Sequence, residues 1–419
     1  MKIRLLAALA LTAAPLLAQP LAAADTTDVS ALIRDNGLIA ARDMLAALED
    51  PSPEQQMGLA ATSFLAGIEG AYQARWRIGA TGMIAPLPAL STELPTNADP
   101  QPLTDRYLND LAENLASAME ATRDHIPAEV PADAGLVLRL ADLWIDIDAN
   151  GQRGPAEGLV AMVSDTLGLG GIRWDDQGNE LPPIDLAGAE VRFDAADLHW
   201  LRAYSHLIAA GAEGVLAFDP APEIARMIAL RQGLAAQWQT SAQAGGEPGM
   251  GAMMAMEYGG MADMIAATLA TLRHQPDPAR VGKTVTHLRN MIAANRDFWT
   301  AVALETDNDR EWIPNDRQQA ALGFSLPAGT GEAWLNVLAD GEKLLDGKLL
   351  IPFWRFAPGH GIDLSSWLAD PAPVDVIGWL QGTEALPHAK AGQLINADSL
   401  RQFEALVGGN AGLYMVLLN

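Results

Sequence analysis

The feature that most constrains the fold is an apolar spacing of three and four residues that recurs along most of the chain. The segment from Gln55 to Gly79 shows it over several turns, in Leu59, Phe64, Leu65, Ile68, Tyr72 and Trp76. This spacing places the apolar side chains on one face of an α-helix. The same pattern predicts helices over about Asp105–His125, Gly260–Arg273 and Pro278–Glu305. We therefore expect a mainly α fold, a multi-helix globular protein with small irregular or β insertions.

The expected β insertions lie between residues 168 and 193. Ile172–Trp174 and Val191–Phe193 each place an arginine between two apolar residues, and Asp175–Glu180 and a proline pair separate them, which is typical of strands joined by turns. Asp194 follows directly, and an aspartate before an Ala-rich apolar run is a typical helix N-cap. Residues 79–104 are dense in Pro, Thr, Asn and Asp and predict an extended loop.

One twelve-residue segment, Asp146 to Glu157, places oxygen-bearing side chains in the order that a calcium ion requires. The ion takes six to eight oxygen ligands, and a loop of this length wraps them around it. Asp146, Asp148 and Asn150 occupy loop positions 1, 3 and 5, and Glu157 at position 12 would give two carboxylate oxygens. Gln152 would offer its main-chain carbonyl from position 7. The sequence thus predicts a single calcium site.

This segment resembles the calcium loop of the EF-hand family, which also places a glycine at position 6, here Gly151. The resemblance covers about thirty residues and implies a helix–loop–helix, with an entering helix over Asp133–Ile145 and an exit helix over about Pro155–Leu167. Arg153 at position 8 and Pro155 at position 10 depart from the family pattern. The alternative is an acidic turn between helices, in which Asp and Asn side chains accept hydrogen bonds from backbone donors.

Residues 1–24 have the features of a secretory signal: basic residues at 2 and 4, an apolar run over 5–17, and three alanines at 22–24. Cleavage would release a chain without an integral membrane segment, exported to the periplasm or the extracellular space.

This chain has no cysteine, so disulfide bonds contribute nothing to its stability. Removing Lys2 and Arg4 leaves 25 basic and 52 acidic residues, a net charge of 25 − 52 = −27. Such a charge excludes nucleic acid as a partner and is compatible with cation binding.

The Gly-rich segment 242–251 predicts a linker or hinge. It would separate an N-terminal helical domain, residues 25–241, which contains the calcium-type loop, from a mixed helical and loop region, residues 252–419, rich in Trp and Pro. A run of methionines begins at the end of the linker and consists of Met250, Met253, Met254, Met256, Met261 and Met264. Thioethers suit copper(I), but methionine also fills cores and forms adaptable contact surfaces.

The main functional expectation is an exported soluble protein that binds one structural calcium ion. The sequence assigns no catalytic residue, because it lacks nucleophile-elbow, zinc-protease and dinucleotide motifs. One alternative is a cell-envelope hydrolase whose scaffold is braced by calcium. Another is an interaction module that uses the Trp-rich carboxyl region or the Met-rich segment 250–264 to bind a protein or glycan partner.

Two further groups of residues are candidates for metal binding. The acidic segment Glu305–Asn315 could hold a cation or form a capped turn, and it lacks the glycine and the closing glutamate of a calcium loop. His199 and His206 share one face of a predicted helix. They are two turns apart, roughly 10 Å, which is too far for one zinc ion.

Overall fold

The computed structural model describes residues 28–80, 94–166, 173–174, 180–181, 185–245, 249–323, 326–396 and 398–407. The predicted signal sequence, residues 1–24, lies outside these ranges, as does the predicted turn over 175–179. The described chain is mainly α, as the apolar spacing predicts. Its α-helices are α1 (Val29–Asn36), α2 (Leu38–Ala46), α3 (Pro53–Arg77), α4 (Tyr107–His125), α5 (Leu159–Thr166), α6 (Ala195–Phe218), α7 (Ala221–Gln243), α8 (Met250–Thr271), α9 (Pro278–Val302), α10 (Thr330–Leu345), α11 (Leu364–Ala369), α12 (Val376–Gln381) and α13 (Asp398–Leu406).

The strands form small separate antiparallel sheets. They are β1 (Leu136–Arg139) with β4 (Glu190–Phe193), β2 (Arg173–Trp174) with β3 (Glu180–Leu181), and the three-stranded sheet of β5 (Ile351–Pro352), β6 (His360–Ile362) and β7 (Ala389–Ala391). The predicted strand at Val191–Phe193 is confirmed as part of β4. Of the one predicted at Ile172–Trp174, the described residues Arg173–Trp174 form β2, and Ile172 lies outside the described ranges. The small β insertions expected from the sequence are therefore present.

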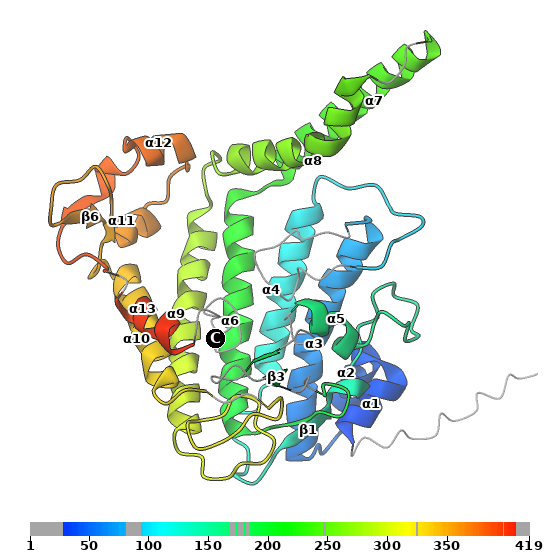
Figure 1. Ribbon diagram of the computed structural model, residues 1–419, viewed down its shortest axis with the longest axis vertical. Helices are drawn as coiled ribbons and strands as arrows, with labels where there is room; N and C mark the ends of the chain where they lie inside the picture. Colours follow the sequence, from blue (N-terminus) through cyan, green and yellow to red (C-terminus); the bar gives the residue numbers. More distant parts are fainter. Residues whose placement is uncertain are drawn as a thin grey trace, which may run out of the picture.

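Four long helices, α3, α4, α6 and α9, lie side by side and form the body of the molecule (Figure 1). Helix α6 packs against both α4 and α9. Small residues at its contacts, such as Ala203 and Ala209, are fully buried and allow the neighbouring helices to approach closely. A capping box fixes the start of α6. The side chain of Asp194 accepts from the Ala196 N–H in the first turn, and the side chain of Asp197 accepts from the Asp194 N–H. The N-cap predicted at Asp194 is confirmed.

The entering helix predicted over Asp133–Ile145 is wrong. Leu136–Arg139 form strand β1, which is followed by a single 3-10 turn over Leu140–Asp142. The side chains of β1 alternate between buried and half-buried positions, as those of a strand do. A short apolar run fits either a helix or a strand, and here the pairing with β4, which is distant in sequence, decides between them.

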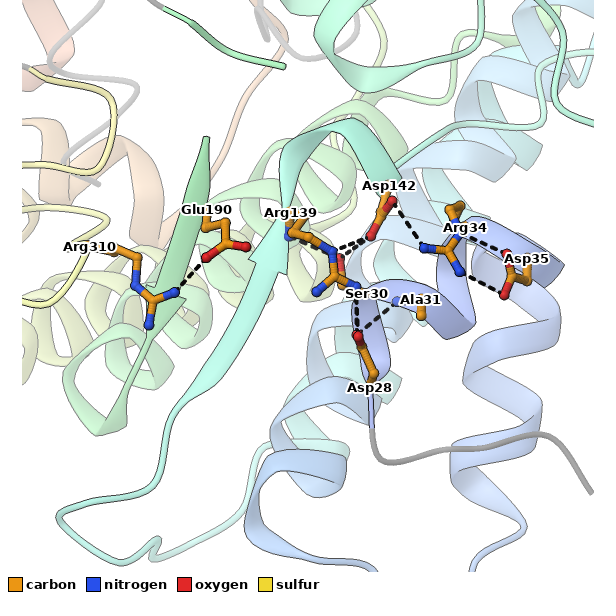
Figure 2. A network of polar contacts seen from close by, with 9 residues as sticks. All are labelled: Asp28, Ser30, Ala31, Arg34, Asp35, Arg139, Asp142, Glu190 and Arg310. Carbon is orange, nitrogen blue, oxygen red and sulfur yellow. Dashed lines mark hydrogen bonds and ion pairs between the residues drawn. The ribbon is translucent and has the colours of Figure 1, made fainter. Parts of the chain in front are cut away.

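A polar network fixes the end of β1 to α1 (Figure 2). Arg139 donates to both carboxylate oxygens of Asp28, at 2.9 and 2.7 Å, and to Asp142 at 2.6 Å. The hydroxyl of Ser30, which is fully buried, accepts from the Arg139 N–H and donates to Asp142. Because Asp28 is also the N-cap of α1, this network joins the start of the helix to the strand.

Helices α7 and α8 form a hairpin that projects from one end of the body (Figure 1). The Gly-rich segment 242–251 joins these two helices, and α8 begins at Met250, earlier than the predicted start at Gly260. Helices from the two sides of this segment pack together, α6 against α9. None of the helices in the described ranges combines the length and the apolar character that crossing a membrane requires.

The close packing of α3 against α4 predicts that alanine substitutions at two glycines of α3 have opposite effects on the free energy of unfolding. A Cβ on Gly67 would lie 2.7 Å from the Cβ of Ala118, whereas a Cβ on Gly70 meets nothing within 4 Å. Gly67→Ala should therefore lower the free energy of unfolding by about 1–3 kcal/mol through overpacking. Gly70→Ala should raise it by about 0.5–1 kcal/mol through helix propensity. Urea denaturation of both variants checks this, and equal stability of the two would contradict the packing.

Candidate metal centre

The loop from Asp146 to Glu157 brings three carboxylates together. One oxygen from each of Asp146, Asp148 and Glu157 lies within 4.8 Å of the other two. Glu157 is only 4% exposed, so its carboxylate lies on the protein side of the cluster. Like charges this close repel one another, and a bound cation relieves that repulsion.

A short antiparallel ladder closes the loop. The N–H of Ile145 donates to the Glu157 carbonyl at 2.8 Å, and the N–H of Leu159 donates to the Leu143 carbonyl at 2.9 Å. The loop therefore follows extended chain, and α5 begins at Leu159 rather than at about Pro155. The helix–loop–helix implied by the EF-hand resemblance is absent on the entering side, while the loop itself keeps the expected length.

The Asp146 carboxylate anchors the turn of the loop. It accepts hydrogen bonds from the N–H groups of Asn150 at 3.1 Å and Gly151 at 2.9 Å. Gly151 has a φ of +73°, which a glycine adopts without strain, and this fits the sharp turn predicted there. The side chain of Asn150 donates to Asp148 at 2.9 Å and accepts from the N–H of Gln152 at 2.7 Å. Ligation by Asn150 and by the Gln152 carbonyl stays a prediction.

The Glu157 carboxylate folds back into the loop. Its Oε1 accepts from the N–H of Ile147 at 2.8 Å, and its Oε2 accepts from the N–H of Gly154 at 2.5 Å. A Cβ on Gly154 would lie 3.1 Å from that Oε2, so the glycine at loop position 9 leaves room for the carboxylate. The Glu157 carboxylate, at the last position of the loop, is therefore held inside it by two backbone N–H groups.

Helix α3 supports the loop from the body of the protein. Glu69 accepts from the N–H of Asp146 at 2.8 Å, and Gln73 donates to the Asp146 carbonyl at 2.8 Å. Glu69 is 1% exposed, and its pKa is raised to about 7, mainly by this burial and also by the charges of Asp146 and Glu157. Spacing along the chain gives no sign of these contacts, because Glu69 and Gln73 lie more than seventy residues before Asp146.

A second carboxylate cluster lies at the start of α6. Oxygen atoms of Asp194, Glu305 and Glu311 all lie within 4.8 Å of one another, and Glu311 is 5% exposed. Glu305 and Glu311 belong to the acidic segment singled out in the sequence, and the fold adds Asp194 from the helix cap. The carboxylate of Glu305 also accepts from Gln318 at 3.2 Å. The sequence therefore indicated two of the three residues and could not indicate the third.

Burial raises the pKa values of Glu305 and Glu311 in this second cluster. The pKa of Glu305 is raised to about 7, mainly by burial and also by the charges of Asp194 and Glu311. Asp197, 7% exposed beside them, has a pKa well above its ordinary value, again mainly through burial. These groups hold protons in the folded protein at a pH where the unfolded chain is ionised.

His206 contacts a histidine of α9 and not His199. The Nδ1 atoms of His206 and His287 lie 2.9 Å apart. Burial, together with the charge of Arg123, lowers the pKa of His206 to about 3, so this ring is neutral at physiological pH. The pair is a hydrogen-bonded contact between α6 and α9.

A cavity of about 510 Å³ lies between α3 and α4 and is relevant to the hydrolase alternative. Its ionisable lining residues are Arg42, Arg77 and His125, so no carboxylate pair of a hydrolase lines it among the described residues. Ser63 lies 2.8 Å from His125, but its hydroxyl is also 2.7 Å from the Leu59 carbonyl, the usual bond of a serine within a helix. The cavity therefore gives no support to a hydrolase.

No protein-family model, curated protein or solved structure matches this chain. Of the five ligands predicted from the sequence, the fold brings the carboxylates of Asp146, Asp148 and Glu157 together and places Asn150 and Gln152 in the same hydrogen-bonded loop.

The second cluster predicts that the metal-free protein loses stability as the pH rises. Glu305 binds its proton more tightly in the folded than in the unfolded state, so its ionisation between about pH 4.5 and about pH 7 opposes folding. Glu305→Gln should remove part of the fall in unfolding temperature between about pH 5 and about pH 8, measured in a chelator. The matched control is Glu404→Gln, an exposed glutamate of α13, which should keep the wild-type dependence. An unchanged pH profile in Glu305→Gln would show that this carboxyl group titrates normally.

Proposed function

We propose that the chain binds one calcium ion in the loop Asp146–Glu157. The observation that supports this most is the convergence of the Asp146, Asp148 and Glu157 carboxylates within 4.8 Å. The cluster offers only oxygen ligands, which suit hard cations such as calcium and magnesium. Calcium is favoured because its larger and more flexible shell accepts a bidentate carboxylate and a main-chain carbonyl, whereas magnesium demands a near-ideal octahedron.

The proposed role of the ion is structural. The loop lies between β1 and α5 and is hydrogen-bonded to Glu69 and Gln73 of α3, so a bound cation would connect three elements. A ligand that binds the folded chain and not the unfolded chain stabilises the fold in proportion to RT ln(1 + [L]/Kd). Three carboxylates and a glycine at position 9 predict the weak affinity of extracellular modules, ~0.1–1 mM.

Export is part of this proposal, because residues 1–24 have the pattern of a cleaved secretory signal. The mature chain would therefore work in the periplasm or the extracellular space. Of the alternatives from the sequence, the interaction module is supported by a separate feature, the exposed apolar side chains of α7 and α8.

Calorimetric titration of calcium into the chelator-stripped mature chain, residues 25–419, tests the proposal. The wild type should show one binding event, and Glu157→Gln should weaken it by at least about 10-fold because the variant loses a charge and a bidentate ligand. Calcium should also raise the unfolding temperature of the wild type. The matched control is Glu311→Gln, which removes one carboxylate from the second cluster and should leave the binding event intact.

Two results would contradict the assignment. Loss of the binding event in Glu311→Gln but not in Glu157→Gln would move the site to the start of α6. If millimolar calcium gave neither a heat of binding nor thermal stabilisation, the loop would be an acidic turn whose side chains only accept hydrogen bonds from backbone N–H groups.

A further inference from the structure

The hairpin of α7 and α8 is attached to the body mainly at its root. There Arg273, just after α8, lies 3.2 Å from Asp375 of the carboxyl region, and His274 lies 2.9 Å from Glu223, which joins the ends of α7 and α8. Beyond the root, the two helices project away from the body (Figure 1). Every residue of α7 from Ala229 onward is exposed. A pair of helices on its own buries too little apolar surface to be stable, so this hairpin lacks a partner.

The hairpin carries most of the exposed large apolar side chains of the described chain. Eleven of eighteen such residues lie on these two helices: Leu230, Leu234 and Trp238 on α7, and Met250, Met253, Met254, Tyr258, Met261, Met264, Ile265 and Leu269 on α8. At roughly half exposure, eleven side chains of this size present on the order of 1,000 Å². A standard protein interface buries about 800 Å² on each partner, and monomers rarely expose patches larger than a few hundred Å².

Helix α8 is apolar on more than one side. Met254 and Met261 are seven residues apart and share one face, whereas Met253 and Met264 share another face about 100° away. Its charged residues are Glu257 and Asp263, and Asp263 pairs with Arg231 of α7 at 2.7 Å. A helix that is apolar all round is normally buried on several sides. Helix α7 covers only one side of α8, so a partner must contact α8 on more than one of its remaining faces.

The charge distribution indicates which partner fits. Residues 232–256, the outer half of the hairpin, contain one charged residue, Glu247, in a chain of net charge −25. Two copies of so acidic a chain repel each other over most of their surfaces. The uncharged outer halves of two hairpins can meet without that repulsion, and their projection keeps the acidic bodies apart (Figure 1).

We propose that this hairpin is a dimerisation element whose partner is the hairpin of a second copy of the same chain. Two hairpins packed face to face form a four-helix bundle, in which each α8 is buried between its own α7 and the helices of the partner. The arrangement is isologous, so each copy offers and receives the same surface. A lipid bilayer fits less well, because α8 carries two acidic residues and no described helix is long and apolar enough to cross it.

Sedimentation of the mature chain over a range of concentrations tests the proposal. The wild type should be a dimer, and Met254→Glu with Met261→Glu should raise its dissociation constant at least ~30-fold, since each charge would be buried at the interface. Met253→Glu with Met264→Glu should act in the same way on the second face. The matched control, Ile377→Glu with Leu386→Glu, adds the same charge at exposed apolar positions of the carboxyl region and should leave the dimer unchanged.

Dimerisation should be the same in calcium and in chelator, so a failure to dimerise would leave the calcium proposal untouched. A wild type that stays monomeric at all concentrations would overturn the proposal. A dimer that survives both hairpin variants, with native circular dichroism, would place the interface elsewhere and overturn it too. Binding of a monomeric wild type to phosphatidylcholine–phosphatidylglycerol vesicles, lost in the hairpin variants, would replace the second copy with a lipid surface.

Discussion

The packing of α6 between α4 and α9 is the interaction on which the rest of the structure depends. Small buried residues such as Ala203 and Ala209 let both neighbours approach, and a long helix of this kind stays folded mainly through such contacts. Glu213, 5% exposed, lies within this packing and pairs with Arg280 of α9 at 2.8 Å, which avoids an uncompensated buried charge. Strand β4 leads directly into the N-cap of α6, so the position of α6 fixes β4. Because β4 pairs with β1, it also fixes β1.

Both carboxylate clusters follow from this arrangement. The capping box of α6 places Asp194 where the chain returns after α9 with Glu305 and Glu311. Strand β1 is held by β4 on one side and by the Arg139 network on the other, and it leads into the ladder that closes the loop over Asp146–Glu157. Like an acidic surface turn, the loop has carboxylates that accept from backbone N–H groups. It differs from such a turn because Glu157 is buried and because Glu69 and Gln73 of α3 hold the backbone of Asp146. Backbone donors hold such a ligand set in place before any cation arrives.

Local patterns predicted the parts of the fold that local forces determine. The spacing over Gln55–Gly79 matches α3, and the aspartate at 194 is the N-cap of α6, because periodicity and capping act within a few residues. The predicted helix over Asp133–Ile145 was wrong because β4, distant in sequence, provides a pairing partner that propensity does not include. The loop spacing indicated Asp146, Asp148 and Glu157, whereas Glu69 and the contact of Asp194 with Glu305 depend on how helices pack. Tertiary contacts of this kind leave no periodic trace in one sequence.

Diffraction is the most direct test of whether the loop carboxylates coordinate calcium. Crystals of the mature chain grown in millimolar calcium, measured at a wavelength where calcium scatters anomalously, locate the ion without reference to activity. We predict one anomalous peak about 2.3–2.6 Å from oxygens of Asp146, Asp148 and Glu157, the usual calcium–oxygen distance. An empty loop, or a peak found only between Asp194, Glu305 and Glu311, would contradict calcium coordination by the loop.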